Sequence, residues 1–301
     1  MDALRMSADY DLISARAHYV STPQVVDFCH YLADYLCGRL FESPYLTQTY
    51  KPKCQYVFVS LQDAWEQYGL EKANQEVLKR LELYQEPLRK AVIERSDEET
   101  SALIEKLFAQ KLLASNSQDW LLSHHTGLAD LLHYACEKLT DPSPDFFSFG
   151  RDYGPRMTVS FSKIYAILIG DFLSYESRVV AGLCYFVRSW CIEKGIDLPP
   201  DLQFGRLQGW GKDKKNNGRN ASWGANVFPS IDRIKKKPAR ESHFARSNIL
   251  ATWVVFEALR LAKERMKDDD SFWLHTPDAM RRIEAALYMM GAELPIVQET
   301  H

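Results

Sequence analysis

Apolar residues recur at intervals of three and four along most of this 301-residue chain, and this is the spacing of one face of an α-helix. Val179, Leu183, Phe186 and Trp190, for example, are separated by four, three and four residues. The β-branched and aromatic cluster at 54–59 is the best candidate for a strand, and it is short. The pattern therefore predicts a mainly α fold with at most a minor strand element.

Start and stop signals divide this pattern into helices. Thr22 followed by Pro23 predicts a helix start, Ser60 predicts an N-cap, and Gly195 predicts a helix end. The predicted helices cover residues 23–37, 61–68, 71–93, 98–113, 127–139, 162–169 and 176–194, followed by two that start near Ser247 and at Thr276-Pro277.

A stretch at 141–145, in which Pro142 and Pro144 alternate with polar residues, is the clearest loop signal in the chain. It predicts a boundary between an N-terminal, mostly helical lobe at 1–140 and a second helical lobe at 141–301. The second lobe is expected to carry a long, basic, glycine-rich loop at 204–246, because this segment shows no periodicity.

Composition excludes several classes of protein. Hydrophobic residues make up 46% of the chain, which is enough for a sizeable core and excludes intrinsic disorder. No apolar run approaches the roughly 20 residues that cross a bilayer, and the first residues lack the pattern of a secretory signal. The six cysteines form no C-x-x-C pair. We therefore expect a cytoplasmic protein with buried thiols and no contact with a membrane.

Cations are concentrated in one segment. The net charge is −3, yet residues 204–246 hold eleven Lys and Arg against three Asp and Glu. This asymmetry favours a polyanionic partner such as nucleic acid, because phosphate neutralisation releases counterions; a solvated basic loop is the alternative. The candidate DNA-binding residues are Arg178, Arg206, Lys212, Lys214, Lys215, Arg219, Lys235, Lys236 and Lys237.

Aromatic residues near these cations are candidates for contact with a base. Trp210 and Trp223 lie inside the basic segment, and Tyr175 lies directly before Glu176. Large aromatic side chains stack on an extruded base or insert as a wedge between base pairs. For the two tryptophans, anchoring of a glycine-rich loop to the core is an equally good explanation.

The signatures of many enzyme classes are absent. The sequence contains no Walker-type phosphate loop, no dinucleotide-binding glycine motif, no nucleophile elbow and no H-E-x-x-H pair. His133 and Cys136 lie one helical turn apart, after His124 and His125, but ordinary helix and loop positions explain these residues better than a metal site does. We therefore expect neither a metal nor a cofactor.

Lys163 and Glu176 lie at the starts of two predicted helices that are joined by a tight turn. The helix dipole disfavours a cation at a helix start and favours a carboxylate there. The unfavourable place of Lys163 points to a function. Glu176 is explained equally well as a catalytic group and as a helix-start anion that pairs with Arg178 or caps the backbone.

The stretch Ser162-Lys163-Ile164-Tyr165-Ala166, followed by Tyr175-Glu176-Ser177-Arg178-Val179, resembles the catalytic region of the helix-hairpin-helix DNA glycosylases. It is most similar to the 8-oxoguanine glycosylase branch and its prokaryotic relatives. Phe272-Trp273 and residues 281–287 resemble the C-terminal part of relatives found near phage-defence genes. The resemblance covers residues 146–200 and 272–291 and implies a two-lobed helical architecture. It makes Lys163 the lysine nucleophile and Glu176 the catalytic acidic residue.

Two departures from the family's pattern bear on the chemistry. Residues 158–162 replace a glycine-rich hairpin whose backbone amides grip a phosphate, and Glu176 replaces an aspartate. A carboxylate near C1′ stabilises the positive charge that develops on the sugar as an N-glycosidic bond breaks. A lysine amine attacks only if burial or a neighbouring cation, such as Arg178, lowers its pKa. If Lys163 stays protonated, water activated by Glu176 takes its place.

These residues predict a DNA glycosylase-like enzyme that extrudes a damaged or modified base from double-stranded DNA and excises it, leaving an abasic site. The resemblance to defence-associated relatives implies a hypermodified phage base, such as a bulky substituted cytosine, as the target. Two alternatives remain open. One is a non-catalytic module that reads modified DNA, and the other is a protein-interaction subunit of a defence system whose basic loop contacts an acidic partner.

Overall fold

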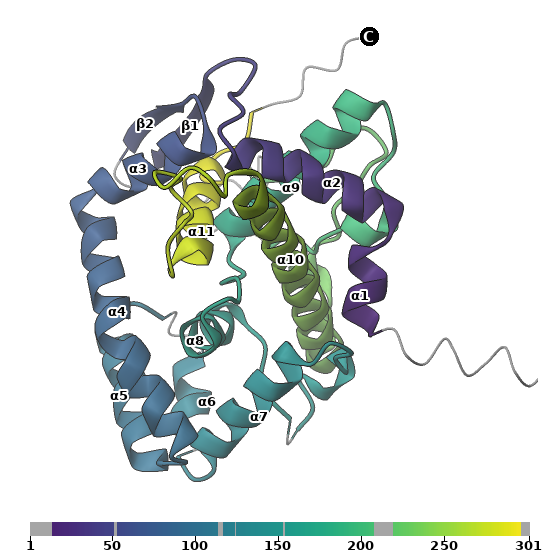
Figure 1. The fold of residues 1–301 in the computed structure, drawn as a ribbon. Coiled ribbons are helices and arrows are strands. Elements are labelled where there is room, and N and C mark those ends of the chain that lie inside the picture. The colour runs from purple at the N-terminus through teal and green to yellow at the C-terminus, as the bar shows by residue number, and fades with distance from the viewer. Residues whose placement is uncertain are drawn as a thin grey trace, which may run out of the picture.

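The computed structural model describes residues 14–50, 53–113, 117–123, 125–152, 154–207 and 219–295, and these are mainly helical (Figure 1), as the apolar spacing predicts. The strands form one antiparallel hairpin in this part of the chain, with Tyr45 opposite Phe58. The elements are α1 (Ala15–Val20), α2 (Pro23–Leu36), β1 (Tyr45–Tyr50), β2 (Lys53–Phe58), α3 (Leu61–Leu70), α4 (Lys72–Ile93), α5 (Asp97–Ala109), α6 (Gln118–Leu122), α7 (Leu128–Thr140), α8 (Val159–Ile169), α9 (Ser177–Lys194), α10 (Lys237–Arg265) and α11 (Ala279–Met290), with short 3₁₀ turns at Phe146–Ser148, Pro200–Leu202 and Ile231–Arg233.

Capping residues define several of these helices as the sequence predicts. Thr22 precedes α2, with Pro23 in the first turn, but the Thr22 side chain makes no capping hydrogen bond. The Ser60 hydroxyl accepts a hydrogen bond from the Asp63 amide at the start of α3. Gly195 ends α9 in the left-handed conformation, with φ of 64°. The strand expected at 54–59 is confirmed as β2, whereas its partner β1 was not predicted.

The start of α10 differs from the expectation. A helix was expected from near Ser247, but α10 begins at Lys237, so the part of the expected loop from 237 to 246 is helical. Pro238 suits the first turn of a helix, and the carboxylate of Glu241 is buried in an ion pair with Arg156. The cations at 235–237 oppose the helix dipole and conceal this start in the sequence.

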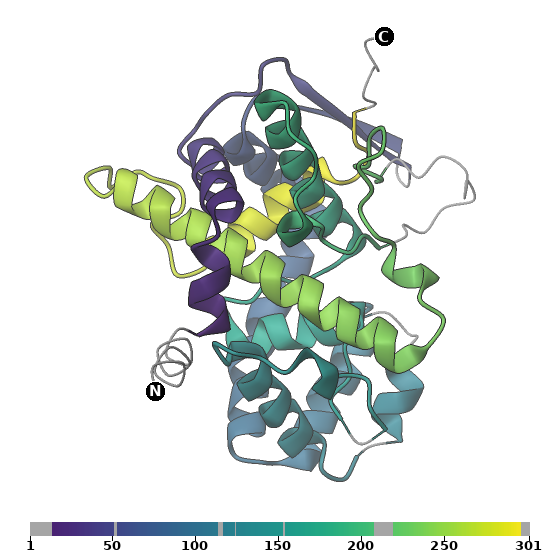
Figure 2. The same ribbon diagram turned by 90° about the vertical axis from the view of Figure 1, so that its right-hand side faces the viewer.

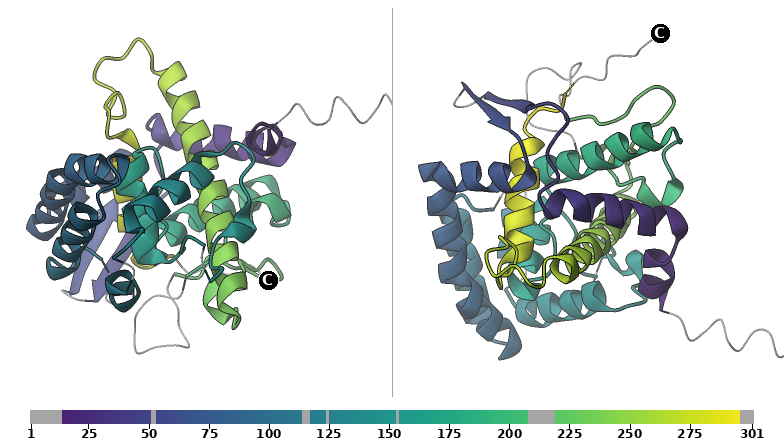
Figure 3. Two further views of the ribbon diagram at one scale, coloured as in Figure 1. Left: turned by 90° about the horizontal axis from the view of Figure 1, so that it is seen from below. Right: turned by 45° about the horizontal axis from the view of Figure 1, so that its top comes forward.

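Figures 2 and 3 show the long α10 crossing the molecule. It packs against α2, while α11 packs between α9 and α3. A second group of helices, α4, α5, α7 and α8, make contacts among themselves. Contacts of α2 with α10 and of α3 with α11 therefore cross residue 140, where a boundary between lobes was predicted, and the division into two lobes stays a prediction.

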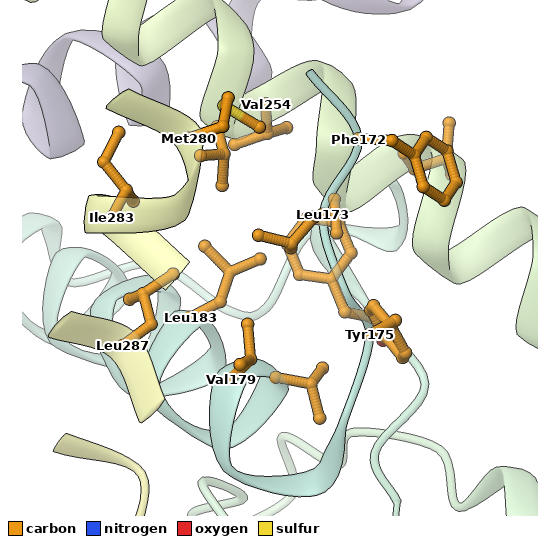
Figure 4. Close-up of a cluster of buried hydrophobic side chains, with 14 of the residues drawn as sticks. Phe172, Leu173, Tyr175, Val179, Leu183, Val254, Met280, Ile283 and Leu287 are labelled. Atoms are coloured by element: carbon orange, nitrogen blue, oxygen red, sulfur yellow. The ribbon is translucent and has the colours of Figure 1, made fainter. Parts of the chain in front are cut away.

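The contact between α9 and α11 is close because two glycines allow it. A Cβ atom on Gly182 would clash with the Leu287 carbonyl, and one on Gly291 would clash with the Arg178 carbonyl. Figure 4 shows the core beside this contact, in which fully buried side chains of α9, α10, α11 and the α8–α9 turn meet. These are Leu173, Val179, Leu183, Val254, Met280, Ile283 and Leu287. The core thus holds the α8–α9 turn against α10 and α11.

Two further expectations concern the thiols and membranes. Cys29, Cys184 and Cys191 are buried, as expected, whereas Cys37 and Cys136 are partly exposed. Among the helices of the described residues, none combines the length and the apolar character needed to cross a bilayer.

Candidate catalytic pair at the α8–α9 turn

Lys163 lies in the second turn of α8. The helix was expected to begin near Ser162, but it begins at Val159, so Lys163 is its fifth residue. The helix dipole acts mainly on the first turn. The argument that Lys163 is electrostatically misplaced at a helix start is therefore wrong, and the interest of this residue depends on what it contacts.

Buried hydrogen bonds hold the turn that follows α8. The Ser162 hydroxyl accepts hydrogen bonds from the Tyr175 amide at 2.6 Å and from the Asn248 side chain at 2.8 Å. The Leu173 amide donates to the Thr252 hydroxyl at 3.2 Å. Asn248 and Thr252 lie on consecutive turns of α10. The turn is thus fixed to α10 by buried side chains.

A second set of contacts fixes the same turn to α11. The Glu284 carboxylate accepts a hydrogen bond from the Ser174 amide at 2.9 Å and forms an ion pair with Arg281. Arg281 in turn donates to the carbonyl groups of Gly170 and Phe172. Two residues after Ser174 the chain reaches Glu176. The position of Glu176 relative to α8 is therefore set by α10 and α11 together.

The Lys163 ammonium lies 3.3 Å from the Glu176 Oε2 atom. Side-chain exposure is 31% for Lys163 and 20% for Glu176, so the pair is neither fully buried nor free in solvent. Glu176 is the N-cap residue of α9, but its side chain makes no capping hydrogen bond. The Arg178 guanidinium lies over the Tyr288 ring instead of pairing with Glu176. The carboxylate thus contacts Lys163 and serves neither of the two structural roles that the sequence suggested.

Glu176 raises the pKa of Lys163 above its ordinary value, and burial opposes this effect only in part. Glu284 and Tyr288 raise it further. The condition for attack by the lysine, a pKa lowered by burial or by Arg178, is therefore not met, because the carboxyl groups of Glu176 and Glu284 raise the pKa of the ammonium. Burial in turn raises the pKa of Glu284, and Arg281 opposes that effect. Lys163 is consequently a charged ammonium at neutral pH.

Three residues of this site were not recognised in the sequence. Glu284 lies within the stretch that carries the family resemblance, but no role was assigned to it. Tyr288, one turn further along α11, and Tyr68 on α3 pack edge to face, with ring centroids 5.8 Å apart. Only the packing of α3 and α9 on α11 brings these side chains to the pair, and spacing in the sequence gives no signal of it.

Tyr175 does not line the site, and its expected contact with a base is wrong. Its ring is fully buried, and its hydroxyl donates a 2.7 Å hydrogen bond to the Gly205 carbonyl. Trp223 is partly buried and packs against Phe228, with ring centroids 6.3 Å apart. This contact is the one expected of a tryptophan that anchors a loop.

The predicted DNA-binding cations differ in their surroundings. Arg206 donates to the Phe228 carbonyl, and burial lowers its pKa. Arg219 donates a 2.7 Å hydrogen bond to the Ser177 hydroxyl, which places it beside the start of α9. Lys235, Lys236 and Lys237 are exposed at the start of α10. Trp210, Lys212, Lys214 and Lys215 lie outside the described residues.

Two hollows of the described structure lie away from the pair. One is lined by Ile104, Phe108 and Leu128, among others, and a more open one by Arg80, Leu83 and residues 109–111. No three potential metal ligands cluster among the described residues. His133, considered above as a ligand, lies 3.6 Å from the Glu137 carboxylate.

Comparison of the chain with protein-family models, with curated proteins and with solved structures found no match.

Proposed function

We propose that this chain is a cytoplasmic DNA N-glycosylase, which extrudes a damaged or modified base from double-stranded DNA and hydrolyses its N-glycosidic bond. The observation that carries the proposal is the convergence of Lys163 and Glu176, from two helices, to 3.3 Å. The resemblance of the stretches around these two residues to the catalytic region of helix-hairpin-helix DNA glycosylases names the same two side chains. A hypermodified phage base as the target rests on that resemblance alone.

The electrostatics of the pair favour attack by water over attack by the lysine. An ammonium whose pKa is raised has no lone pair to form a Schiff base at neutral pH. In the hydrolytic route, Glu176 accepts a proton from water as the water oxygen bonds to C1′. The bond between C1′ and the base nitrogen breaks, and its electron pair leaves with the base, which takes up a proton. The Lys163 ammonium orients the Glu176 carboxylate for this step.

Exposed cations support binding of the DNA backbone. Lys235, Lys236 and Lys237 form no ion pair with another described residue, and they lie at the helix start where the dipole of α10 is positive. This arrangement stabilises phosphate groups in preference to cations. Arg219, hydrogen-bonded beside the start of α9, links the basic segment to the catalytic pair.

The proposal is tested by base release. Duplexes that each contain one candidate base, namely 8-oxoguanine, uracil, hypoxanthine or a substituted cytosine, are incubated with the protein, and abasic sites are scored by alkaline strand cleavage. We expect release from at least one duplex, abolished by Lys163→Gln and by Glu176→Gln. Absence of release from every duplex would overturn the enzyme assignment and favour the module that reads modified DNA. Negligible binding of DNA, with a salt dependence near zero, would favour the protein-interaction subunit.

Borohydride trapping on abasic DNA separates the two routes. Because Lys163 is charged, we expect no covalent adduct at neutral pH. An adduct that disappears in Lys163→Gln would show lysine attack and would overturn the hydrolytic assignment.

A further inference from the structure

Tyr288 and Arg178 form a stacked pair next to the catalytic residues. The Arg178 guanidinium lies over the Tyr288 ring, 4.6 Å from the centroid. Tyr288 is partly buried against the core and is close enough to Lys163 to raise the pKa of its ammonium. The pair is held in place by the close contact of α9 and α11, in which the Arg178 carbonyl lies against Gly291.

Tyr68 adds a buried ring with an unused hydroxyl. The residue is 9% exposed and packs edge to face on Tyr288. Its hydroxyl makes no hydrogen bond to another described residue, and it is not fully enclosed by the protein. The hydroxyl is therefore accessible to solvent. Burial raises the pKa of Tyr68, and Tyr288, Glu284 and Glu176 raise it further, whereas Arg178 opposes them.

Buried tyrosines ordinarily have a hydrogen-bond partner for the hydroxyl. The Tyr68 hydroxyl has none among the described residues, and the Tyr68 ring packs on Tyr288, whose ring in turn lies against the Arg178 guanidinium. A flat, polar ligand placed beside the pair would find an aromatic–guanidinium surface to stack on and a hydroxyl for its polar edge. A nucleobase has this chemistry.

We propose that Tyr68, Tyr288 and Arg178 form the base-binding subsite of this protein, in which the extruded base packs against the Tyr288–Arg178 stack and its polar edge hydrogen-bonds to the Tyr68 hydroxyl. This inference rests on the proposed function, and it adds the residues that select the base. It replaces Tyr175, whose hydroxyl is already used by the Gly205 carbonyl.

The test compares duplexes with and without a base at the target position. Equilibrium binding is measured for each candidate duplex and for a matched duplex that carries a tetrahydrofuran abasic analogue, with Lys163→Gln present in every protein to prevent turnover. Tyr68→Phe removes only the hydroxyl, and Tyr288→Leu removes the ring. Tyr134→Phe is the control, because Tyr134 is an exposed tyrosine on α7.

We expect Tyr68→Phe and Tyr288→Leu to weaken binding of the base-containing duplex about tenfold, as expected for loss of one stacking or polar contact, and to leave binding of the abasic duplex unchanged. In the Lys163-containing background the same changes raise KM more than they lower kcat. A merely structural role would weaken binding of both duplexes alike. Equal weakening of both duplexes, or an unchanged affinity in a folded Tyr68→Phe variant, would overturn the subsite. Base release by the wild type would in that case still support the proposed function.

Failure of the two proposals can be told apart. If the wild type releases no base but prefers the base-containing duplex, and the tyrosine variants lose this preference, the subsite is supported and the glycosylase activity is refuted. A protein that binds every base-containing duplex no better than the abasic one has no base-binding subsite.

Discussion

Two ion pairs lie near the first turn of α8, and they are built differently. Arg156 and Glu241 approach to 2.6 Å, with Glu241 only 1% exposed. Both oxygens of that carboxylate accept from the Arg156 Nε atom at 2.9 Å, and one also accepts from the Met157 amide. Lys163 and Glu176 share a single 3.3 Å contact, and both remain partly accessible.

The difference separates a structural ion pair from a chemical one. A buried carboxylate that fills its lone pairs with protein donors has compensated the cost of burial, and it has nothing left to offer a substrate. Glu176 keeps one oxygen without a hydrogen-bond partner among the described residues, next to solvent. The first pair therefore fixes the entry to α8, while the second is the one that the proposed function assigns to proton transfer.

The largest effect is expected where the structural pair is broken. Arg156→Met leaves the Glu241 carboxylate buried with the Met157 amide alone, and removal of one partner from a buried pair costs about 3–5 kcal/mol. Chemical denaturation of the variant measures this loss in the free energy of unfolding. The double variant Arg156→Met, Glu241→Met should recover much of it. A loss below about 1 kcal/mol would mean that this pair behaves as a surface one.

Breaking the candidate catalytic pair, Lys163–Glu176, should instead lower activity much more than stability. Glu176→Gln should lower the rate of base release at least about a hundredfold, because a general base contributes that much, and change the free energy of unfolding by no more than about 1 kcal/mol. The matched control is Lys194→Gln, which breaks an exposed 3.0 Å pair with Asp27 and should alter neither quantity much. If Glu176→Gln were as destabilised as Arg156→Met, the Lys163–Glu176 pair would have a structural role instead.

The cations outside the two pairs should act on affinity alone. Replacing Lys235, Lys236 and Lys237 by Gln is expected to weaken DNA binding about tenfold at moderate salt and to make the logarithmic salt dependence shallower by about 0.9 per lost phosphate contact. Replacing the exposed Lys79, Lys90 and Lys106 of α4 and α5 changes the net charge equally. If both triple variants behave alike, the effect comes from net charge and not from the start of α10.

Local signals predicted most of the fold. Pro23, Ser60 and Gly195 act on the backbone next to them, so their effects can be predicted from the sequence. The start of α10 was missed because its buried Glu241 is stabilised by Arg156, which is distant in sequence. Strand β1 was missed because it forms only through pairing with β2. Contacts between distant residues decided the elements that local patterns did not.

The site was predictable only in part, for the same reason. The resemblance named Lys163 and Glu176, and the structure brings them together. Spacing along the chain did not reveal that Glu284, Tyr288 and Tyr68 lie beside them, since α3, α9 and α11 meet only in the folded state. Tyr175 was selected because it precedes the candidate residue Glu176, but its own side chain is buried in the core and bonded to the Gly205 carbonyl.

Glu284 combines features of both ion pairs, and it gives the smallest and most specific prediction. Its carboxylate is anchored by the Ser174 amide and Arg281, as Glu241 is anchored, but it also faces Lys163 and Glu176. Burial raises its pKa, with Arg281 opposing. A carboxyl group with a raised pKa in the folded state favours folding below its unfolded pKa of about 4.3, and this contribution is lost as the pH rises through the folded-state value.

Glu284→Gln removes this titration and keeps an acceptor for the Ser174 amide. The free energy of unfolding of the wild type relative to Glu284→Gln should therefore fall as the pH is raised from 4 to 7, by less than about 1 kcal/mol because Arg281 compensates the charge in part. Denaturation at a series of pH values measures this difference, and Glu86→Gln, with 78% of the carboxyl side chain exposed, is the control. A relative stability that rises with pH would mean that the ion pair with Arg281 outweighs burial, and that Glu284 belongs with Glu241 as a purely structural anion.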